Sequence, residues 1–120
     1  MHDADLQRAI EAMESSSYAE MHRLLEPLVK LRVPGALALS GLAYQLGLGV
    51  AADGVTAVRL LREASELGDG TAAHNLGSLF VGGCPGVEPD IEAARKWYRL
   101  ARHLGAVFGT TPFEAWLDRK

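Results

Sequence analysis

The feature that most constrains this chain is an internal repeat. Residues 36–68 and 72–105 carry small, apolar and turn-forming residues in the same order. Gly41 and Gly77, for example, are 36 residues apart, and the offset becomes 37 further along the chain. In repeat proteins of this period each unit buries its apolar face only against its neighbours. The sequence therefore predicts a stacked array rather than one closed core.

A third, partial copy lies upstream at the same offset. Leu24 and Leu25 stand 36 residues before Leu60 and Leu61, so the repeat extends through most of the chain. A chain of 120 residues is long enough for one domain of this kind and too short for two. We expect one domain over residues 1–120, with repeats at about 1–34, 35–70 and 71–106 and a capping helix at 111–119.

Each copy has the pattern of two helices joined by a Gly-rich turn. In the second helix of the middle copy, apolar residues recur at spacings of three and four, as on one face of an α-helix. These residues are Ala57, Leu60, Leu61, Ala64 and Leu67. The predicted fold is an all-α solenoid of about three helix-turn-helix repeats plus a C-terminal capping helix. Helices are expected near 3–14, 17–31, 35–47, 53–67, 71–82, 90–104 and 111–119.

Residues that favour helix ends lie where these helices should begin and stop. Asp, Ser and Thr side chains accept hydrogen bonds from free N–H groups at a helix start, and glycine accommodates the turn after a helix end. The expected starts are Asp53, Asp90 and the capping boxes Ser17 with Glu20 and Thr111 with Glu114, and the expected stops are Gly68 and Gly105. Gly41 and Gly77 lie inside helices, where glycine is costly, so we interpret them as points of close contact between helices.

Composition excludes several classes of protein. Hydrophobic residues make up 48% of the chain, which is enough apolar surface for a folded core. The formal charge is -3, so binding to nucleic-acid phosphates is not expected. No segment approaches the roughly 18 consecutive apolar residues of a membrane span, and the N-terminus lacks a secretion signal. The single cysteine, Cys84, fits a reducing compartment, and we expect a cytoplasmic location.

The last full copy resembles the pattern of a known family. Residues 72–106 are similar to a Sel1-like repeat, a relative of the tetratricopeptide repeat. The resemblance is carried by Ala72, Leu76, Gly77, Phe80, Gly82, Gly83, Gly86, Val87, Asp90, Ala94, Trp97, Tyr98, Ala101 and Gly105. It is looser over 36–68 and weakest at the N-terminus. The resemblance implies a right-handed stack of helix pairs that binds other proteins and has no chemistry of its own.

Aromatic residues in and after this copy have places in the same scheme. Trp97 and Tyr98 stand where the repeat pattern calls for aromatic residues between helices, and we expect them to pack there. Phe113, Trp116 and Leu117 recur at spacings of three and four, so they would give the predicted C-terminal helix an apolar face. That helix would close the end of the stack.

Basic residues gather on one predicted helix of this acidic chain. Arg95, Lys96, Arg99 and Arg102 share a face of helix 90–104, either as a surface for an acidic partner or as the solvated back of the helix. Glu92 stands four residues before Lys96, a spacing that favours an ion pair.

Three features raise the alternative of an enzyme or small-ligand-binding protein that uses the Gly-rich loops. Segment 47–52 fits the GxGxxA form of a dinucleotide fingerprint, but that motif needs a preceding strand, and a helical pattern precedes it here. Cys84 has no nearby histidine to activate it. The four histidines lack metal-ligand spacing. We therefore predict no catalytic residue, no cofactor-binding residue and no metal site.

The predicted function is a non-enzymatic protein-binding module, as a small bacterial adaptor or an immunity protein that inhibits a cognate toxin. Its partner would be another protein, with no nucleic acid or membrane involved, and the oligomeric state stays open. In a stack of helix pairs the first helices line the inner, concave side. The predicted partner-binding residues on that side are Leu39, Leu42, Gln45, His74, Asn75, Ser78 and Val81.

The first helix of the middle copy has a second apolar stripe. Leu39, Leu42 and Leu46 recur at spacings of three and four, which makes the helix apolar nearly all round. One interpretation buries this stripe against Ile10 and Met13 of the N-terminal pair. The other leaves it as an exposed apolar strip rimmed by polar residues, as in a recognition surface.

Overall fold

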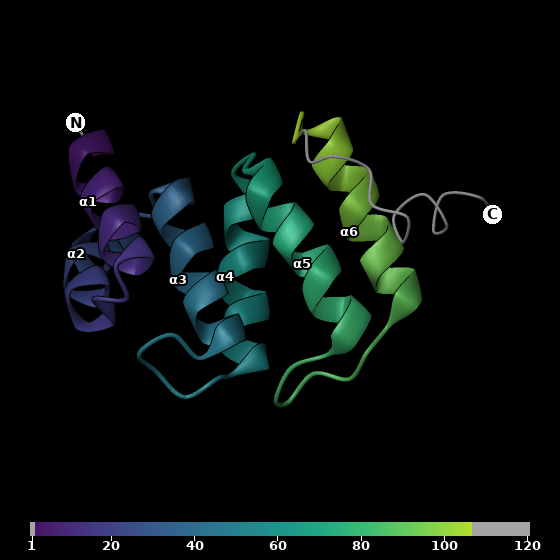
Figure 1. The fold of residues 1–120 in the computed structure, drawn as a ribbon. Helices are drawn as coiled ribbons and strands as arrows, with labels where there is room; N and C mark the ends of the chain where they lie inside the picture. Colours follow the sequence, from purple (N-terminus) through teal and green to yellow (C-terminus); the bar gives the residue numbers. More distant parts are fainter. Residues whose placement is uncertain (1, 107–120) are drawn as a thin grey trace.

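The computed structural model describes residues 2–106, and these fold into helices without a strand (Figure 1). The helices are α1 (Asp3–Glu14), α2 (Tyr18–Lys30), α3 (Pro34–Leu46), α4 (Gly54–Glu66), α5 (Gly70–Gly82) and α6 (Ile91–His103). They agree with the predicted helices to within a residue or two at each end. The predicted helix 111–119 and the capping box of Thr111 and Glu114 lie outside the described residues.

Consecutive helices pair as hairpins, and the hairpins stand side by side as a solenoid (Figure 1). The pairs are α1 with α2, α3 with α4, and α5 with α6. The first helices also contact one another, α1 with α3 and α3 with α5, so they form a continuous inner layer. This confirms the predicted all-α solenoid.

Aspartate carboxylates begin three of the helices. Asp53 accepts a hydrogen bond from the backbone N–H of Thr56 at 3.2 Å, and Asp90 accepts one from Ala93 at 3.0 Å, as predicted. Asp69 does the same for Ala72 at 2.9 Å, although the sequence analysis did not identify it as a cap. Each bond satisfies a backbone donor that the first helical turn leaves free.

The predicted capping box at the start of α2 is wrong. Ser17 precedes the helix, but its side chain makes no capping hydrogen bond. Glu20 instead receives two hydrogen bonds from the guanidinium of Arg23, one of them 2.7 Å long between Nε and Oε2. A two-point bond to a cation is stronger than a bond from one backbone N–H, so the carboxylate faces Arg23.

Glycine ends two of the second helices, as the sequence predicts. Gly68 follows α4 with φ of 97°, and Gly105 follows α6 with φ of 83°. Residues with a Cβ rarely adopt this left-handed conformation, which reverses the chain after a helix. The reversal turns each pair toward the next position in the stack.

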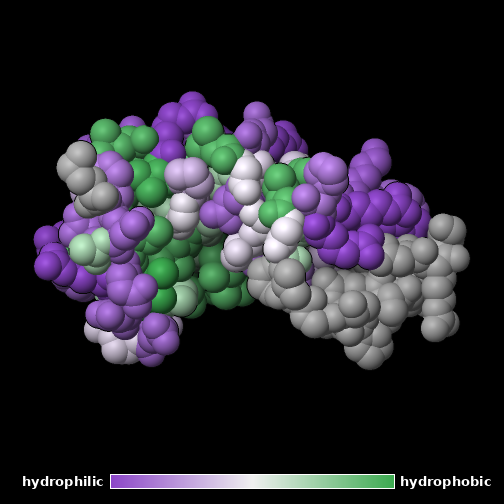
Figure 2. Space-filling view, turned by 90° about the horizontal axis from the view of Figure 1, so that it is seen from above, coloured by the Kyte–Doolittle hydropathy of each residue, from purple (hydrophilic) through white to green (hydrophobic). Residues whose placement is uncertain are grey.

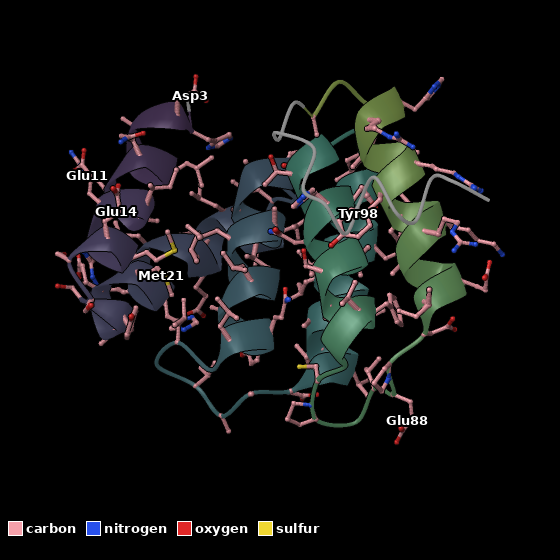
Figure 3. The ribbon with its side chains drawn as sticks, turned by 45° about the vertical axis from the view of Figure 1, so that its right-hand side comes forward. Asp3, Glu11, Glu14, Met21, Glu88 and Tyr98 are labelled. Carbon is pink, nitrogen blue, oxygen red and sulfur yellow. The ribbon has the colours of Figure 1, made fainter. Side chains whose placement is uncertain are left out.

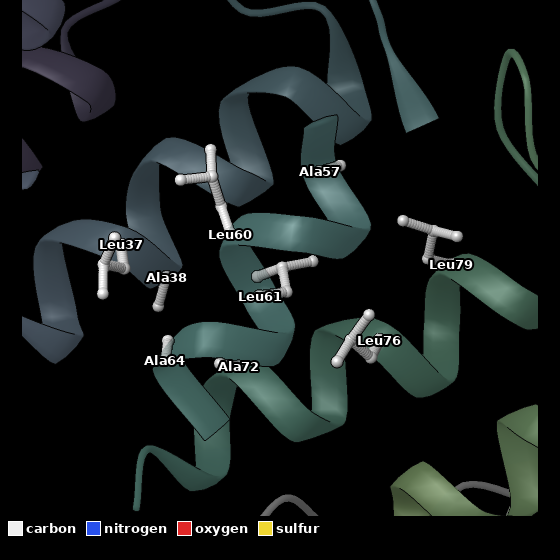
Figure 4. Packing of buried hydrophobic residues seen from close by; sticks show 9 residues of the cluster. All are labelled: Leu37, Ala38, Ala57, Leu60, Leu61, Ala64, Ala72, Leu76 and Leu79. Carbon is white, nitrogen blue, oxygen red and sulfur yellow. The ribbon is translucent and has the colours of Figure 1, made fainter. Parts of the chain in front are cut away.

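Buried apolar residues form two clusters along the stack. The first joins α3, α4 and α5 (Figure 4) and comprises Leu37, Ala38, Ala57, Leu60, Leu61, Ala64, Ala72, Leu76 and Leu79. The second joins α1, α2 and α3 and comprises Ala9, Ala12, Met21, Leu25, Leu28, Ala36, Leu39 and Ala43. Helix α3 contributes to both clusters, so it ties the N-terminal pair to the repeats.

The two helices of each full repeat approach closely at a glycine. A Cβ atom at Gly77 would lie 2.7 Å from the ring of Tyr98, and a Cβ at Gly41 would lie 2.7 Å from Cγ of Leu61. Both distances are too short for real atoms, so the interpretation of these glycines as contact points is confirmed. Trp97 packs against the cluster of α3, α4 and α5, which confirms packing between helices for both aromatic residues.

We expect Gly77→Ala to lower the free energy of unfolding by about 1–3 kcal/mol, because the new methyl group overpacks the contact with Tyr98. The matched control is Gly82→Ala in the same helix, where a Cβ would meet nothing within 4 Å. This control should be neutral or slightly stabilising, because alanine favours the helix over glycine. Urea unfolding followed by circular dichroism measures both. Equal stability of Gly77→Ala and the wild type would contradict the close contact.

Candidate partner-binding groove

An apolar groove of about 320 Å³ lies on the inner layer of first helices. Its walls come from α1 and α5 and its floor comes from α3. The lining residues are Leu6, Ile10, Met13, Gly35, Ala38, Leu39, Leu42, Asp69, Thr71 and Asn75. Figure 2 shows apolar side chains gathered in a hollow beside the N-terminal end. Leu6, Ile10, Met13 and Leu42 are all half-buried, so the groove presents apolar surface to solvent.

The wall on α1 follows from the spacing of its apolar residues. Leu6, Ile10 and Met13 recur at spacings of four and three, which places them on one face of the helix. Leu6 packs onto Gly35, where a Cβ atom would lie 2.6 Å from Cδ2 of the leucine. The glycine thus brings α1 against the start of α3, and the remaining length of the stripe faces the groove.

Charge is distributed unevenly among the helices. Helices α3 and α5 contain no Asp, Glu, Lys or Arg, whereas α2, α4 and α6 carry both signs. Helix α1 has four acidic residues and one basic residue. The floor of the groove on α3 is therefore neutral, and its charged residues lie on α1 and, at the start of α5, at Asp69.

The apolar stripe of α3 runs from the core to solvent. Leu39 is 8% exposed and belongs to the cluster of α1, α2 and α3, although it also lines the groove. Its contact with a partner stays a prediction. Leu42 is half-buried against the same cluster and lines the groove, while Leu46 is 58% exposed and lies outside it.

Only some of the predicted partner-binding residues come together. Asn75 joins Leu42 in the groove. His74 and Ser78 lie at the junction of α5 and α6, where the His74 ring packs edge-on against Tyr98 with centroids 5.2 Å apart. The Ser78 hydroxyl lies 3.1 Å from that of Tyr98.

Gln45 and Val81 are half-buried and lie outside the groove.

Leu6 was not predicted as a groove residue, and Ile10 and Met13 were predicted only as packing partners. The helical spacing of these three residues could have identified α1 as a wall of the groove.

Gln45 and Cys84 meet where two repeats adjoin. The Cys84 thiol donates a hydrogen bond to the Gln45 carbonyl oxygen at 3.4 Å, and Oε1 of Gln45 is buried without a hydrogen-bond partner among residues 2–106. Burial and, to a smaller extent, the Asp53 carboxylate raise the pKa of the Cys84 thiol above its ordinary value. A raised pKa keeps sulfur protonated, which opposes the role of a nucleophile.

The segment that fits the dinucleotide fingerprint is a turn between two helices. Gly47 and Gly49 both have φ of 73°, and Gly47 ends α3 directly. Gly83 and Gly86 repeat the positive φ in the turn between α5 and α6. A dinucleotide site needs a strand before the glycines and a helix immediately after them, and this turn has neither arrangement.

The predicted basic face of α6 needs correction at one residue. Arg95 is 5% exposed and forms an ion pair with Glu92 at 3.1 Å, in place of the expected pair of Glu92 with Lys96. Arg95 lies three residues before Tyr98, on the side of α6 that turns toward α5. Lys96, Arg99 and Arg102 are exposed.

Within residues 2–106, no group of three or more His, Cys, Asp or Glu side chains is placed to hold a metal ion. None of the helices in this part of the chain has the length and apolar character needed to cross a membrane.

The sequence profile of the Sel1 repeat matches residues 34–69 and 70–105. The chain belongs to the Sel1 repeat family. The two matches coincide with the hairpins α3–α4 and α5–α6, and the N-terminal pair lies outside them. Sel1 repeats mediate interactions between proteins, which gives the apolar groove its context.

Solved structures of Sel1 repeat proteins share the fold. A Sel1 repeat protein from Oxalobacter formigenes superposes with a TM-score of 0.71 and 29% identity, over 82% of this chain and 39% of its own. The protein c5321, a protective antigen of uropathogenic Escherichia coli with an SLR fold, superposes with a TM-score of 0.72 and 26% identity, over 87% of this chain and 23% of its own. This chain thus spans less than half the length of either protein. No curated protein sequence matches it.

We expect Cys84 to react with iodoacetamide more slowly in the folded protein than in urea at the same pH. The raised pKa leaves less thiolate in the folded state, so the rate should rise with pH through a midpoint above the ordinary value of about 8.5. Mass spectrometry of timed samples measures the rate. Faster alkylation of the folded protein, or a midpoint below that of free cysteine, would support a nucleophilic role instead.

Proposed function

We propose that this Sel1 repeat protein is a non-enzymatic interaction module that binds a partner protein in the groove formed by α1, α3 and α5. The observation that carries the proposal is the groove itself, with half-buried Leu6, Ile10, Met13 and Leu42 around a charge-free centre. Contiguous exposed apolar surface rimmed by polar residues is typical of binding sites in soluble proteins.

A larger groove of about 670 Å³ lies beside α4, but five of its nine lining residues are charged, so the apolar inner groove is the better candidate. The second helices α2 and α4 carry ion pairs near the surface. Lys30 pairs with exposed Glu26 at 3.3 Å, and Arg32, which follows α2, pairs with half-buried Glu63 at 3.1 Å. Exposed pairs of this kind contribute little to affinity. Apolar side chains that lose water in a central pocket contribute most, and the groove supplies them.

At a finer level, the chain acts as a small adaptor or as an immunity protein that neutralises a cognate toxin. The formal charge of -3 favours a basic partner, because opposite net charges speed association. A cytoplasmic location agrees with the single, unpaired cysteine. These features motivate the test of a toxin as the partner.

We expect Leu42→Asp to weaken partner binding about tenfold or more, because it places a carboxylate in the apolar groove. Leu46→Asp is the matched control, with the same change on the same helix at an exposed position outside the groove. The measurement is quantitative co-purification of the partner with each tagged variant from the native host. Loss of binding by both variants, or by neither, would contradict the groove as the site.

A second variant keeps this test decisive if Leu42→Asp unfolds the protein. Asn75→Arg adds bulk and charge to the opposite wall without entering either apolar cluster. Circular dichroism first establishes that each variant is folded. A folded Asn75→Arg protein that retains full binding would place the partner elsewhere.

The immunity function has its own test. We expect co-expression of this chain to relieve growth inhibition by the product of a neighbouring toxin gene, and Leu42→Asp to lose that protection. Colony counts with and without induction measure the effect. Continued killing at equal expression of the wild-type chain would exclude immunity and leave the adaptor function.

A further inference from the structure

We infer that the occupant of the groove is an amphipathic helix of the partner, with an apolar face toward α3 and Lys or Arg residues along the flank that faces α1. This inference rests on the proposed function and adds the partner's chemistry to it.

The dimensions of the inner layer suit a helix. Helix α3 lies between α1 and α5, which do not contact each other. Packed helices lie about 8–10 Å apart between their axes, so a partner helix at that distance above α3 can also contact the facing sides of α1 and α5. The groove residues on α3 run from Gly35 to Leu42, so the floor is about 10 Å long, or about two helical turns.

The apolar residues of the groove match the pattern that a helix presents. Leu6, Ile10 and Met13 run along α1 at spacings of four and three, and Leu42 faces them from α3. An amphipathic helix carries apolar side chains at the same spacings, so its ridge can follow the groove. Methionine adapts its shape to different partners, which favours a binding wall.

The rim of the α1 wall is acidic. Asp3, Gln7, Ile10 and Glu14 follow one another at spacings of four, three and four, so two carboxylates lie in line with a groove residue. The one basic residue of α1, Arg8, forms its ion pair with Asp5 at 3.4 Å. Neither Asp3 nor Glu14 forms an ion pair within residues 2–106. Figure 3 shows Asp3, Glu11 and Glu14 on this helix at the outer end of the molecule.

The opposite wall carries less available negative charge. Thr71 and Asn75 line it together with Asp69, whose carboxylate accepts a hydrogen bond from the backbone N–H of Ala72 at the positive end of the α5 dipole, which partly offsets its charge. A partner helix therefore meets more negative charge on the flank of α1. Opposite charges on facing surfaces fix the orientation of a bound helix and exclude wrong partners.

The test uses two synthetic peptides of about 16 residues, held helical by side-chain lactam bridges. Both carry leucine at helical spacings of three and four, and they differ only in one flank, which is lysine in the first and glutamate in the second. Fluorescence anisotropy measures their binding to the full-length protein at about 0.05 M and about 0.5 M salt. We expect the lysine peptide to bind about fivefold more tightly at low salt, and the difference to shrink at high salt.

Charge reversal locates the effect. The double variant Asp3→Lys, Glu14→Lys should abolish or invert the preference for the lysine peptide. The control Glu20→Lys, Glu26→Lys makes the same change in net charge at exposed positions of α2 outside the groove, so it should leave most of the preference intact. An equal loss of the preference for the lysine peptide in both variants would mean that the preference depends on net charge, and it would overturn the inference.

The remaining outcomes separate this inference from the proposed function. Equal binding of both peptides, lost in Leu42→Asp, would overturn the basic flank and leave the groove as a site for a neutral helix. If neither peptide binds at about 1 mM, the inference of a helix in the groove is wrong. The proposed function is then tested separately, by co-purification of the native partner with Leu42→Asp and Leu46→Asp.

Two other occupants would also overturn the inference. Sedimentation that shows a dimer, lost in Leu42→Asp, would assign the groove to a second copy of the chain. A gain in peptide affinity in the variant Phe113→Ser, Leu117→Ser would assign it to the chain's own C-terminal segment.

Discussion

The close contact between the two helices of each repeat is the constraint on which the rest of the structure depends. Gly77 brings α5 against the ring of Tyr98, and Gly41 brings α3 against Leu61. These contacts fix the distance and rotation between the paired helices. Because packed interiors resist deformation, the orientation of each pair also fixes where the next one stacks. The inner layer of first helices, and the groove on it, follow from this geometry.

The same constraint separates the roles of the helices. An internal first helix packs against its own second helix and against neighbours on both sides, so most of its surface must be small or apolar. Helix α3 illustrates this, since seven of its residues from Ala36 to Ala43 are buried and none is charged. The second helices have one free side, and they carry the charged residues. A stack built in this way has a polar outer side and a neutral inner side.

Most of the fold could be predicted from the sequence because the helix caps, helix stops and helix contacts predicted for the repeat occur in both of its copies. The caps at Asp53 and Asp90, the stops at Gly68 and Gly105, and the contacts at Gly41 and Gly77 each occur in two copies, so one copy supports the reading of the other. The capping box at Ser17 had no second copy, and a stronger bond between Glu20 and Arg23 replaced it.

The candidate site was less predictable because it joins elements that are not repeats of one another. Burial of Leu39 depends on how α1 and α2 meet α3, and periodicity alone leaves both sides of α3 equally apolar. The burial of Arg95 likewise depends on the rotation of α6 against α5. Leu42 and Asn75 were identified because they lie on internal first helices, whereas Leu6 lies on a helix outside the matched repeats.

This difference explains why specificity should reside at the N-terminal end. The internal helices α3 and α5 are held by packing on both sides, so a charged residue on their inner surface would stand next to buried apolar groups at a cost in stability. Among the described helices, α1 contacts only α2 and α3. Its apolar stripe completes the groove, and the adjacent carboxylates can vary without disturbing the stack. In the proposed interaction, helix α1 selects the partner and the repeats supply the shape of the surface.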